Sequence, residues 1–339
     1  MQQSKWRTIL QKTTREPQAL LAELGMAAGR VRISRQAADN FPLRVPDGFL
    51  KRVRPGDIHD PLLRQILPLA EEDETTPGYT SDPLGENTSQ PVPGLLHKYH
   101  GRALLIVTGA CAIHCRYCFR RHFPYTDANP SPHQWRQALD YLGNDPDITE
   151  IILSGGDPLT VSNNKLEKLV NELSGIAHIR RLRIHTRIPI VLPERIDDGL
   201  IAILTGASGV GANAPTPYAR LQPVMVVHAN HAREIDDSVA CAARKLRDAR
   251  IPLLNQSVLL KDVNDSVAVL QELSEKLFSI GILPYYLHML DPVQGTAHFA
   301  VSEERAVEII RRLREQLPGY LVPRLVREVP GHASKLPVG

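Results

Sequence analysis

The sequence of 339 residues predicts an α/β fold with a parallel sheet. From residue 101 onwards, apolar runs alternate with amphipathic runs, which is the pattern of strands joined by crossover helices. Six such units fit a partial barrel as well as an open sheet, and in either fold a functional site lies at the carboxyl ends of the strands. The expected strands are 103–108, 149–153, 182–186, 223–228, 253–259 and 283–289, and the expected helices are 132–142, 163–174, 197–205, 235–249, 266–280 and 302–317.

The first hundred residues are expected to form a mostly helical extension and a linker. Leu20, Leu21 and Leu24 have helical spacing, and several prolines between 42 and 68 divide the following stretch into short pieces. Residues 75–93 are rich in Pro, Gly, Ser, Asp and Thr and are predicted to be a loop. We expect this extension to pack on the main domain, with docking to a partner as the alternative.

Composition and charge are those of an ordinary globular protein. Hydrophobic residues make up 42%, charged residues 23%, and the net charge of +3 is too small to indicate nucleic-acid binding. The first residues have no apolar signal-peptide core, and the longest apolar run is too short to span a membrane, so we expect a cytoplasmic protein. Cys241 lies in a helical pattern and is predicted to be a buried apolar residue.

Three of the four cysteines form one loop, with the spacing C-x3-C-x2-C, directly after the first expected strand. Clustered thiolates from Cys111, Cys115 and Cys118 would bind a soft metal. A [4Fe–4S] cluster usually takes four cysteines, so three would leave one iron open to another ligand. The alternative is a zinc site that takes His114 or His122 as its fourth ligand.

Polar residues recur at the ends of the later strands. Gly155, Gly156 and Asp157 follow the second strand, where paired glycines let a ligand approach the backbone or simply make a turn. His228 and Gln256 belong to the fourth and fifth strands and would be costly to bury without partners. Asp291 follows the sixth strand, where it binds a cation or caps a turn.

Lys335 lies near the carboxyl terminus, after a strand-like run and a Pro-Gly loop. A terminal lysine is normally solvated, but this one could turn back into the site. A desolvated lysine has a lowered pKa and forms Schiff bases with pyridoxal phosphate (PLP).

Together these motifs resemble the lysine 2,3-aminomutases, a family of radical S-adenosylmethionine (SAM) enzymes that also use PLP. The likeness runs from about His97 to Pro337. It is carried by HKYHGR at 97–102, CAIHCRYCFRRHF at 111–123, SGGD at 154–157, RIPIVLPERI at 187–196, NQSVLLKDVND at 255–265 and EVPGHASK at 328–335. The resemblance implies a partial (β/α)6-type radical-SAM barrel at 101–290, an N-terminal mostly helical extension at 1–100, and a short C-terminal segment, 291–339, that carries the PLP lysine and completes the site.

The resemblance also implies a role for each matched residue. The three loop cysteines would hold a [4Fe–4S] cluster whose open iron binds SAM, and Lys335 would form an internal aldimine with PLP. The matched PLP-phosphate positions are Tyr99, Arg102 and Lys98, and the SAM positions are Gly155, Gly156, Asp157, His228 and Gln256. Arg120 matches the arginine that pairs with the substrate carboxylate, and Asp291 and Glu328 match acids that hold the ε-ammonium of lysine.

The implied activity is conversion of (S)-α-lysine to (R)-β-lysine through a 5′-deoxyadenosyl radical and a PLP aldimine, with a one-electron donor such as a flavodoxin. The Gly-His-Ala-Ser loop before Lys335 and the four residues after it resemble the elongation factor P-associated branch, which supplies β-lysine to a separate ligase. The alternatives are an aminomutase for another amino acid, such as glutamate, and a non-catalytic zinc-binding protein of the translation apparatus.

Overall fold

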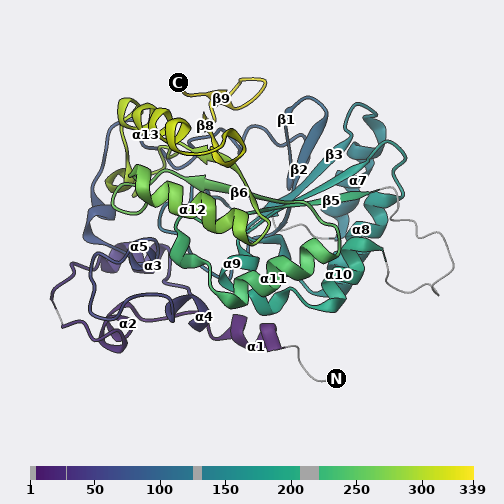
Figure 1. Ribbon diagram of the computed structural model, residues 1–339. Coiled ribbons are helices and arrows are strands. Elements are labelled where there is room, and N and C mark those ends of the chain that lie inside the picture. The colour runs from purple at the N-terminus through teal and green to yellow at the C-terminus, as the bar shows by residue number, and fades with distance from the viewer. Residues whose placement is uncertain (1–4, 28, 125–131, 207–220) are drawn as a thin grey trace.

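The computed structural model describes residues 5–27, 29–124, 132–206 and 221–339 and contains one nine-stranded sheet (Figure 1). Its strands follow one another in chain order, from β1 to β9. Strands β2 to β8 are parallel, and β1 and β9 add antiparallel strands at the two edges. The bounds are β1 Leu95–Tyr99, β2 Arg102–Thr108, β3 Glu150–Gly155, β4 Arg181–Thr186, β5 Gln222–Val227, β6 Leu253–Val258, β7 Leu283–His288, β8 Arg324–Arg327 and β9 Leu336–Pro337.

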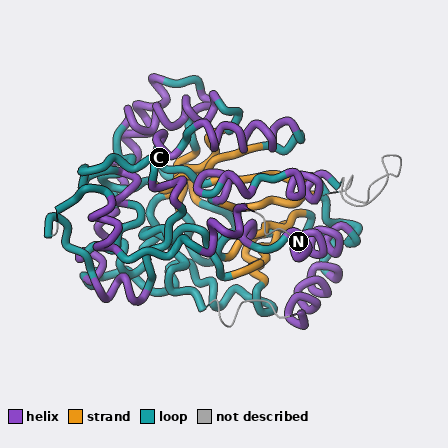
Figure 2. Tube along the Cα trace, turned by 90° about the horizontal axis from the view of Figure 1, so that it is seen from below, coloured by secondary structure: helices purple, strands orange, loops and turns teal. Residues whose placement is uncertain are grey.

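Because every crossover moves one strand along the sheet in the same direction, the strand order never reverses. That topology belongs to barrels, whereas a doubly wound open sheet reverses at a switch point. The sheet is therefore a partial barrel, with an antiparallel strand at each edge. In Figure 2 the orange strands lie side by side, and purple helices lie outside them.

Six crossover helices follow strands β2 to β7. They are α7 Pro132–Asn144, α8 Asn163–Ser174, α10 Asp198–Thr205, α11 Asp237–Asp248, α12 Val267–Ser279 and α13 Glu303–Gln316. The last five begin at a Ser or Asp whose side chain accepts a hydrogen bond from a backbone N–H in the first turn, which is the N-cap arrangement. All six expected strands and all six expected helices are confirmed, each end lying within two residues of its expected position.

The two edge strands, β1 and β9, and strand β8 were not among the strands expected from the sequence. These three strands are two to five residues long, too short to show clear periodicity. Strand β1 lies before residue 100 and forms a hairpin with β2, in which Gly101 takes a φ of +74°. The expected boundary at residue 100 therefore falls inside a hairpin of the sheet.

Cys241 is exposed, so the expectation that it is buried was wrong. Helix α11 buries Val239, Ala242, Ala243 and Leu246 and turns position 241 to the opposite side. The buried positions have the spacing i, i+3, i+4, i+7 of one helical face, and a cysteine two residues after the first of them does not belong to that face.

The N-terminal segment packs on the barrel through short helices, gathered below the sheet in Figure 1. Trp6, Leu20, Phe49 and Leu62 belong to the same hydrophobic cluster as the barrel strands, so the expected packing is found. The elements are α1 Lys5–Gln11, α2 Pro17–Glu23, α3 Arg35–Asn40, α4 Asp47–Leu50, α5 Pro61–Arg64 and the 3-10 helix η1 Ala70–Asp73. Residues 75–93, expected as a loop, contain neither a helix nor a named strand.

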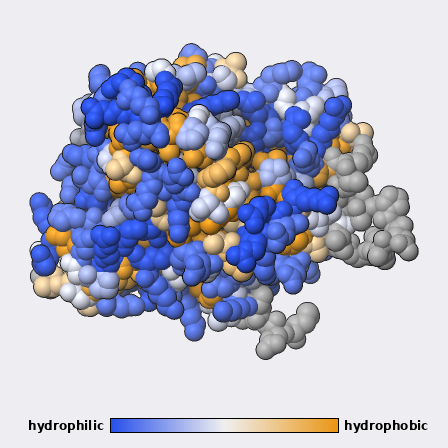
Figure 3. Space-filling model, viewed as in Figure 1, coloured by the Kyte–Doolittle hydropathy of each residue, from blue (hydrophilic) through white to orange (hydrophobic). Residues whose placement is uncertain are grey.

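The outer surface is largely hydrophilic in the view of Figure 3. Helix α13 illustrates the reason: its buried face is Ala306, Ile309, Ile310 and Leu313, and its other positions are mostly Glu and Arg. Among the helices that the structure describes, none has both the length and the apolar character needed to cross a membrane.

Candidate active site

A cavity of about 400 Å³ opens at the carboxyl ends of the parallel strands. The structure brings every site residue expected from the sequence to its wall, although these residues come from the whole length of the sheet. The fifteen are Lys98, Tyr99, Arg102, Cys111, Cys115, Cys118, Arg120, Gly155, Gly156, Asp157, His228, Gln256, Asp291, Glu328 and Lys335. Their convergence in one cavity agrees with a common site, and their separate roles stay predictions.

The cysteine loop directly follows β2 and places three thiols close to one another. Burial raises the pKa of Cys118 to about 11, and the neighbouring Cys115 adds to this shift. Burial also raises the pKa of Cys111 well above its usual value, with further contributions from Cys118 and Asp157. Three thiolates in such a place need a positively charged group among them, which is what a metal centre supplies.

The two histidines considered as zinc ligands face other partners. His114 Nδ1 lies 2.8 Å from the carbonyl oxygen of Pro42, and its ring stacks on Phe41 at 4.3 Å. His122 Nε2 lies 3.2 Å from the carbonyl oxygen of Gln294. In the described ranges, no three His, Cys, Asp or Glu side chains are grouped around a position for a single ion. One ring nitrogen of each histidine already faces a backbone carbonyl oxygen.

The N-terminal segment clamps the cysteine loop. Glu72 accepts two hydrogen bonds from Arg116, at 2.8 and 2.6 Å, and one from Arg121 at 2.6 Å. The side chains of Glu72 and Arg116 are fully buried. The backbone N–H of His114 donates to the carbonyl oxygen of Arg44 at 3.0 Å. Residues with no catalytic signature in the sequence thus fix the loop that carries the thiols.

The paired glycines have a packing role beside any ligand role. A Cβ at Gly155 would lie 2.5 Å from the carbonyl oxygen of Thr108, and one at Gly156 would lie 2.5 Å from that of Ala110. Gly155 also has a φ of +117°, which L side chains rarely adopt. Both positions need glycine because the end of β3 lies directly against the start of the cysteine loop.

Asp157 turns its carboxylate into the protein rather than to the cavity centre. It accepts hydrogen bonds from Thr186 Oγ1 at 2.7 Å, from the N–H of Arg187 at 2.7 Å and from the N–H of Leu159 at 3.1 Å. Burial nevertheless raises its pKa to about 6, against the effect of these donors. The carboxylate joins the ends of β3 and β4, and its expected cofactor contact remains a prediction.

His228 is neutral at physiological pH, because burial lowers its pKa to about 3. Its Nε2 lies 2.8 Å from the hydroxyl of Tyr117, and the two rings stack at 5.7 Å. An uncharged imidazole beside the cysteine loop can form hydrogen bonds without adding charge.

Near Lys335, ammonium and carboxylate groups of the cavity wall lie next to one another. Lys335 Nζ lies 2.7 Å from Glu328 Oε2, and Lys98 Nζ lies 3.2 Å from Glu328 Oε1. Although burial opposes it, these two ammonium groups lower the pKa of Glu328 to about 2. Burial and the nearby Glu328 raise the pKa of Asp291 to about 7. Of these two acids, Glu328 is therefore ionised at neutral pH, whereas Asp291 titrates near neutrality.

Arg120 has a partner that the sequence did not suggest. Glu86 accepts from Arg120 Nε at 2.6 Å and from Nη2 at 2.8 Å, and Ser154 Oγ accepts from Nη1 at 2.9 Å. Glu86 also lies 3.5 Å from Lys98 Nζ. It lies in the stretch expected as a linker, and its side chain is almost completely buried although the segment is a loop.

Comparisons with known proteins agree with these features. The model of the Radical SAM superfamily matches residues 105–273. L-lysine 2,3-aminomutase of Escherichia coli is 46% identical over 98% of this chain and 94% of its own length. The Haemophilus influenzae enzyme of the same name is 43% identical over 98% and 95%. That of Clostridium subterminale is 38% identical over 89% of this chain and 70% of its own length.

Proposed function

The chain belongs to the L-lysine 2,3-aminomutase family of radical SAM enzymes, and from this membership we propose that it converts (S)-α-lysine into (R)-β-lysine. Family membership makes it an enzyme, an isomerase. The observation that carries the substrate proposal is the convergence of three thiols, Lys335 and the two acids Asp291 and Glu328 on one cavity wall.

The family uses a [4Fe–4S] cluster, SAM and PLP, and the residues present fit these groups. Cys111, Cys115 and Cys118 would hold the cluster, and Lys335 would hold PLP, with its phosphate near Lys98, Tyr99 and Arg102. When bound, the cofactors supply the one-electron chemistry that breaks a strong C–H bond and the conjugated carrier for the amino group.

The protein's own residues would orient lysine along the cavity. Arg120 would bind the substrate carboxylate. Glu86, which already accepts hydrogen bonds from Arg120, would hold the guanidinium in a fixed direction. Asp291 and Glu328 would receive the ε-ammonium. Fixing both ends of the substrate decides which carbon faces the reacting centre, where small displacements are costly.

The acids also distinguish lysine from the other substrate considered. The side-chain carboxylate of glutamate would face Glu328, which stays ionised, whereas the ammonium of lysine is attracted to it. The non-catalytic zinc protein is disfavoured by membership of an enzyme family and by the contacts of His114 and His122.

We further propose that the product serves elongation factor P. The support is sequence-based: the loop Gly331–Ser334 before Lys335 departs from the glycine-rich loop of the classical members, and this departure motivates the resemblance to the elongation factor P-associated branch. The partners would be lysine as a small-molecule substrate, a one-electron donor such as a flavodoxin, and the ligase that transfers β-lysine, all in the cytoplasm. The check is mass spectrometry of elongation factor P incubated with that ligase and the product made here. A mass unchanged from the ligase control without product would contradict the link.

One anaerobic incubation tests the activity itself. Protein reconstituted with iron, sulfide and PLP is incubated with SAM, a reductant and lysine, and the products are separated by chromatography against both β-lysine enantiomers. We expect (R)-β-lysine from lysine and no β-glutamate from a parallel incubation with glutamate. SAM cleavage without any β-lysine would contradict the substrate proposal.

Asp291 predicts a pH dependence of lysine binding. Because its pKa lies at about 7, the carboxyl is protonated below that pH and must lose a proton before it can pair with an ammonium. We therefore expect the KM for lysine to rise by up to about tenfold for each pH unit below 7 and to level off above it. Glu328 cannot produce this change, since it is ionised throughout this range.

The matched control for this prediction is Asp291→Asn. This variant should bind lysine weakly at every pH and should lose the dependence between pH 6 and 8, while its KM for SAM stays near the wild-type value. If the same slope persisted in the asparagine variant, the titrating group would be another residue.

A further inference from the structure

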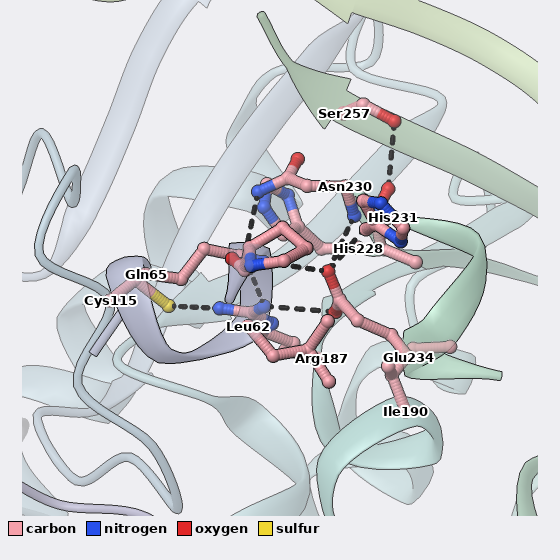
Figure 4. A network of polar contacts seen from close by, with 12 residues as sticks. Leu62, Gln65, Cys115, Arg187, Ile190, His228, Asn230, His231, Glu234 and Ser257 are labelled. Carbon is pink, nitrogen blue, oxygen red and sulfur yellow. Dashed lines mark hydrogen bonds and ion pairs between the residues drawn. The ribbon is translucent and has the colours of Figure 1, made fainter. Parts of the chain in front are cut away.

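Arg187 donates a hydrogen bond to the sulfur of a loop cysteine. Its Nη1 lies 2.7 Å from Cys115 Sγ, and its guanidinium is buried at the end of β4 (Figure 4). The guanidinium also lies 5.8 Å from the ring centre of Tyr117, in the same loop. A permanent positive charge therefore adjoins one of the three thiols.

Two buried groups hold this arginine in place. Arg187 Nη2 donates to Gln65 Oε1 at 2.7 Å and to Glu234 Oε2 at 2.9 Å, while its backbone N–H donates to Asp157 at 2.7 Å. Glu234 is fully buried and also accepts from the backbone N–H groups of Asn230 and His231. One terminal nitrogen of the guanidinium thus contacts the sulfur of Cys115, and the other contacts the carboxylate of Glu234.

Gln65 is the residue that links these groups. It follows α5 in the N-terminal segment, and it is fully buried although it is polar. Its Oε1 accepts from Arg187, from Asn230 Nδ2 at 3.1 Å and from Tyr117 at 3.3 Å. Its Nε2 donates to Glu234 Oε1 at 3.1 Å and to the carbonyl oxygen of Pro61 at 3.1 Å. Figure 4 shows this amide between the cysteine and the acid.

We propose that Arg187 sets the reduction potential of the iron–sulfur cluster through Cys115, and that Gln65 is the positioning residue that holds Arg187 there. Reduction adds negative charge to a cluster, so a cation and a hydrogen bond at a ligand sulfur stabilise the reduced form and raise its potential. A fully hydrogen-bonded buried network fixes its members, so the arginine keeps this position. The proposal rests on Cys115 being a cluster ligand.

The test is an anaerobic redox titration of the reconstituted protein, followed by electron paramagnetic resonance of the reduced cluster, without substrate. Arg187→Met should shift the midpoint potential to more negative values, because both the charge and the hydrogen bond are lost. Gln65→Met should shift it in the same direction by a smaller amount, since the ion pair with Glu234 remains. Arg187→Lys, which keeps the charge, should retain more of the wild-type potential than Arg187→Met.

The matched control is Arg195→Met. Arg195 is as deeply buried and also packs on the N-terminal segment, 4.5 Å from the Trp6 ring, but donates to the carbonyl oxygen of Leu159 instead of a cysteine. Replacing Arg195 should lower the free energy of unfolding without shifting the midpoint potential of the cluster. If Arg187→Met fails to fold, Gln65→Met decides the matter, because it keeps the guanidinium and its ion pair with Glu234 and removes the hydrogen bond that positions the arginine.

Three outcomes would overturn the proposal. An unchanged potential in both Arg187→Met and Gln65→Met, with wild-type iron content, would show that the network is only structural. An equal shift in Arg195→Met would show a general loss of packing. A wild-type protein that takes up no four-iron cluster would instead remove Cys115 as a ligand, and this result concerns the site itself rather than the arginine.

Discussion

Replacing Lys335 with alanine is expected to abolish product formation and the visible absorbance of lysine-bound PLP, while leaving the iron content unchanged. Lys335 is held in the cavity by its 2.7 Å contact with Glu328 and by the pairing of β9 with β8 directly after it. The cysteines lie on a loop that follows β2, at the other end of the parallel sheet, so their site does not depend on this lysine. Turnover should fall by at least about 10²-fold, the usual cost of misplacing a reacting group, because PLP loses its covalent attachment.

Two controls make the Lys335 result specific. Lys276→Ala removes an exposed lysine on α12 and should leave absorbance, iron and turnover at wild-type values. Unfolding measurements on Lys335→Ala should show a nearly wild-type free energy, because the ammonium is partly exposed and Glu328 keeps Lys98 as a partner. If Lys335→Ala kept the PLP absorbance, another lysine would be the attachment point.

The barrel was predictable from the sequence because its signal is local. Each crossover helix shows its buried face within one apolar pattern, and the strands show either an apolar run, as in residues 103–107, or apolar residues at alternate positions, as in 181–186. The edge strands were not predictable in this way. Leu336–Pro337 is two residues long, and only its partner β8 makes it a strand.

The cavity residues were predictable where they belong to recognisable motifs at strand ends, as Cys115 and Lys335 do. Gln65, Glu72 and Glu86 were not, because each lies in a segment with no periodicity and its partner is at least 34 positions away in the chain. Burial of a polar side chain depends on such distant contacts, and no local pattern encodes them. The N-terminal segment therefore appears inert in the sequence and yet supports the cysteine loop in the structure.

Glu72 provides the strongest test of that support. Glu72→Gln should lower the free energy of unfolding by about 3–5 kcal/mol, the usual cost of removing one partner from a buried ion pair. Two arginine side chains depend on this carboxylate, Arg116 with no exposure and Arg121 with 4%. Arg116 lies between Cys115 and Tyr117, so its uncompensated charge should also loosen the cysteine loop and reduce iron uptake. Denaturant unfolding of the metal-free protein and iron analysis after reconstitution measure the two effects.

The neighbouring Glu71 is the natural control, because it occupies the same 3-10 helix, η1, but is exposed. Glu71→Gln makes the same chemical change and should alter the free energy of unfolding by less than about 0.5 kcal/mol. A Glu72→Gln protein as stable as Glu71→Gln would mean that the buried arginines find other acceptors, such as the carbonyl oxygens of Phe41 and Ala37 that Arg116 already contacts. If Glu72→Gln loses stability but takes up iron normally, Glu72 contributes to folding alone. If it loses both stability and iron uptake, the N-terminal segment holds the thiols in a geometry that binds iron.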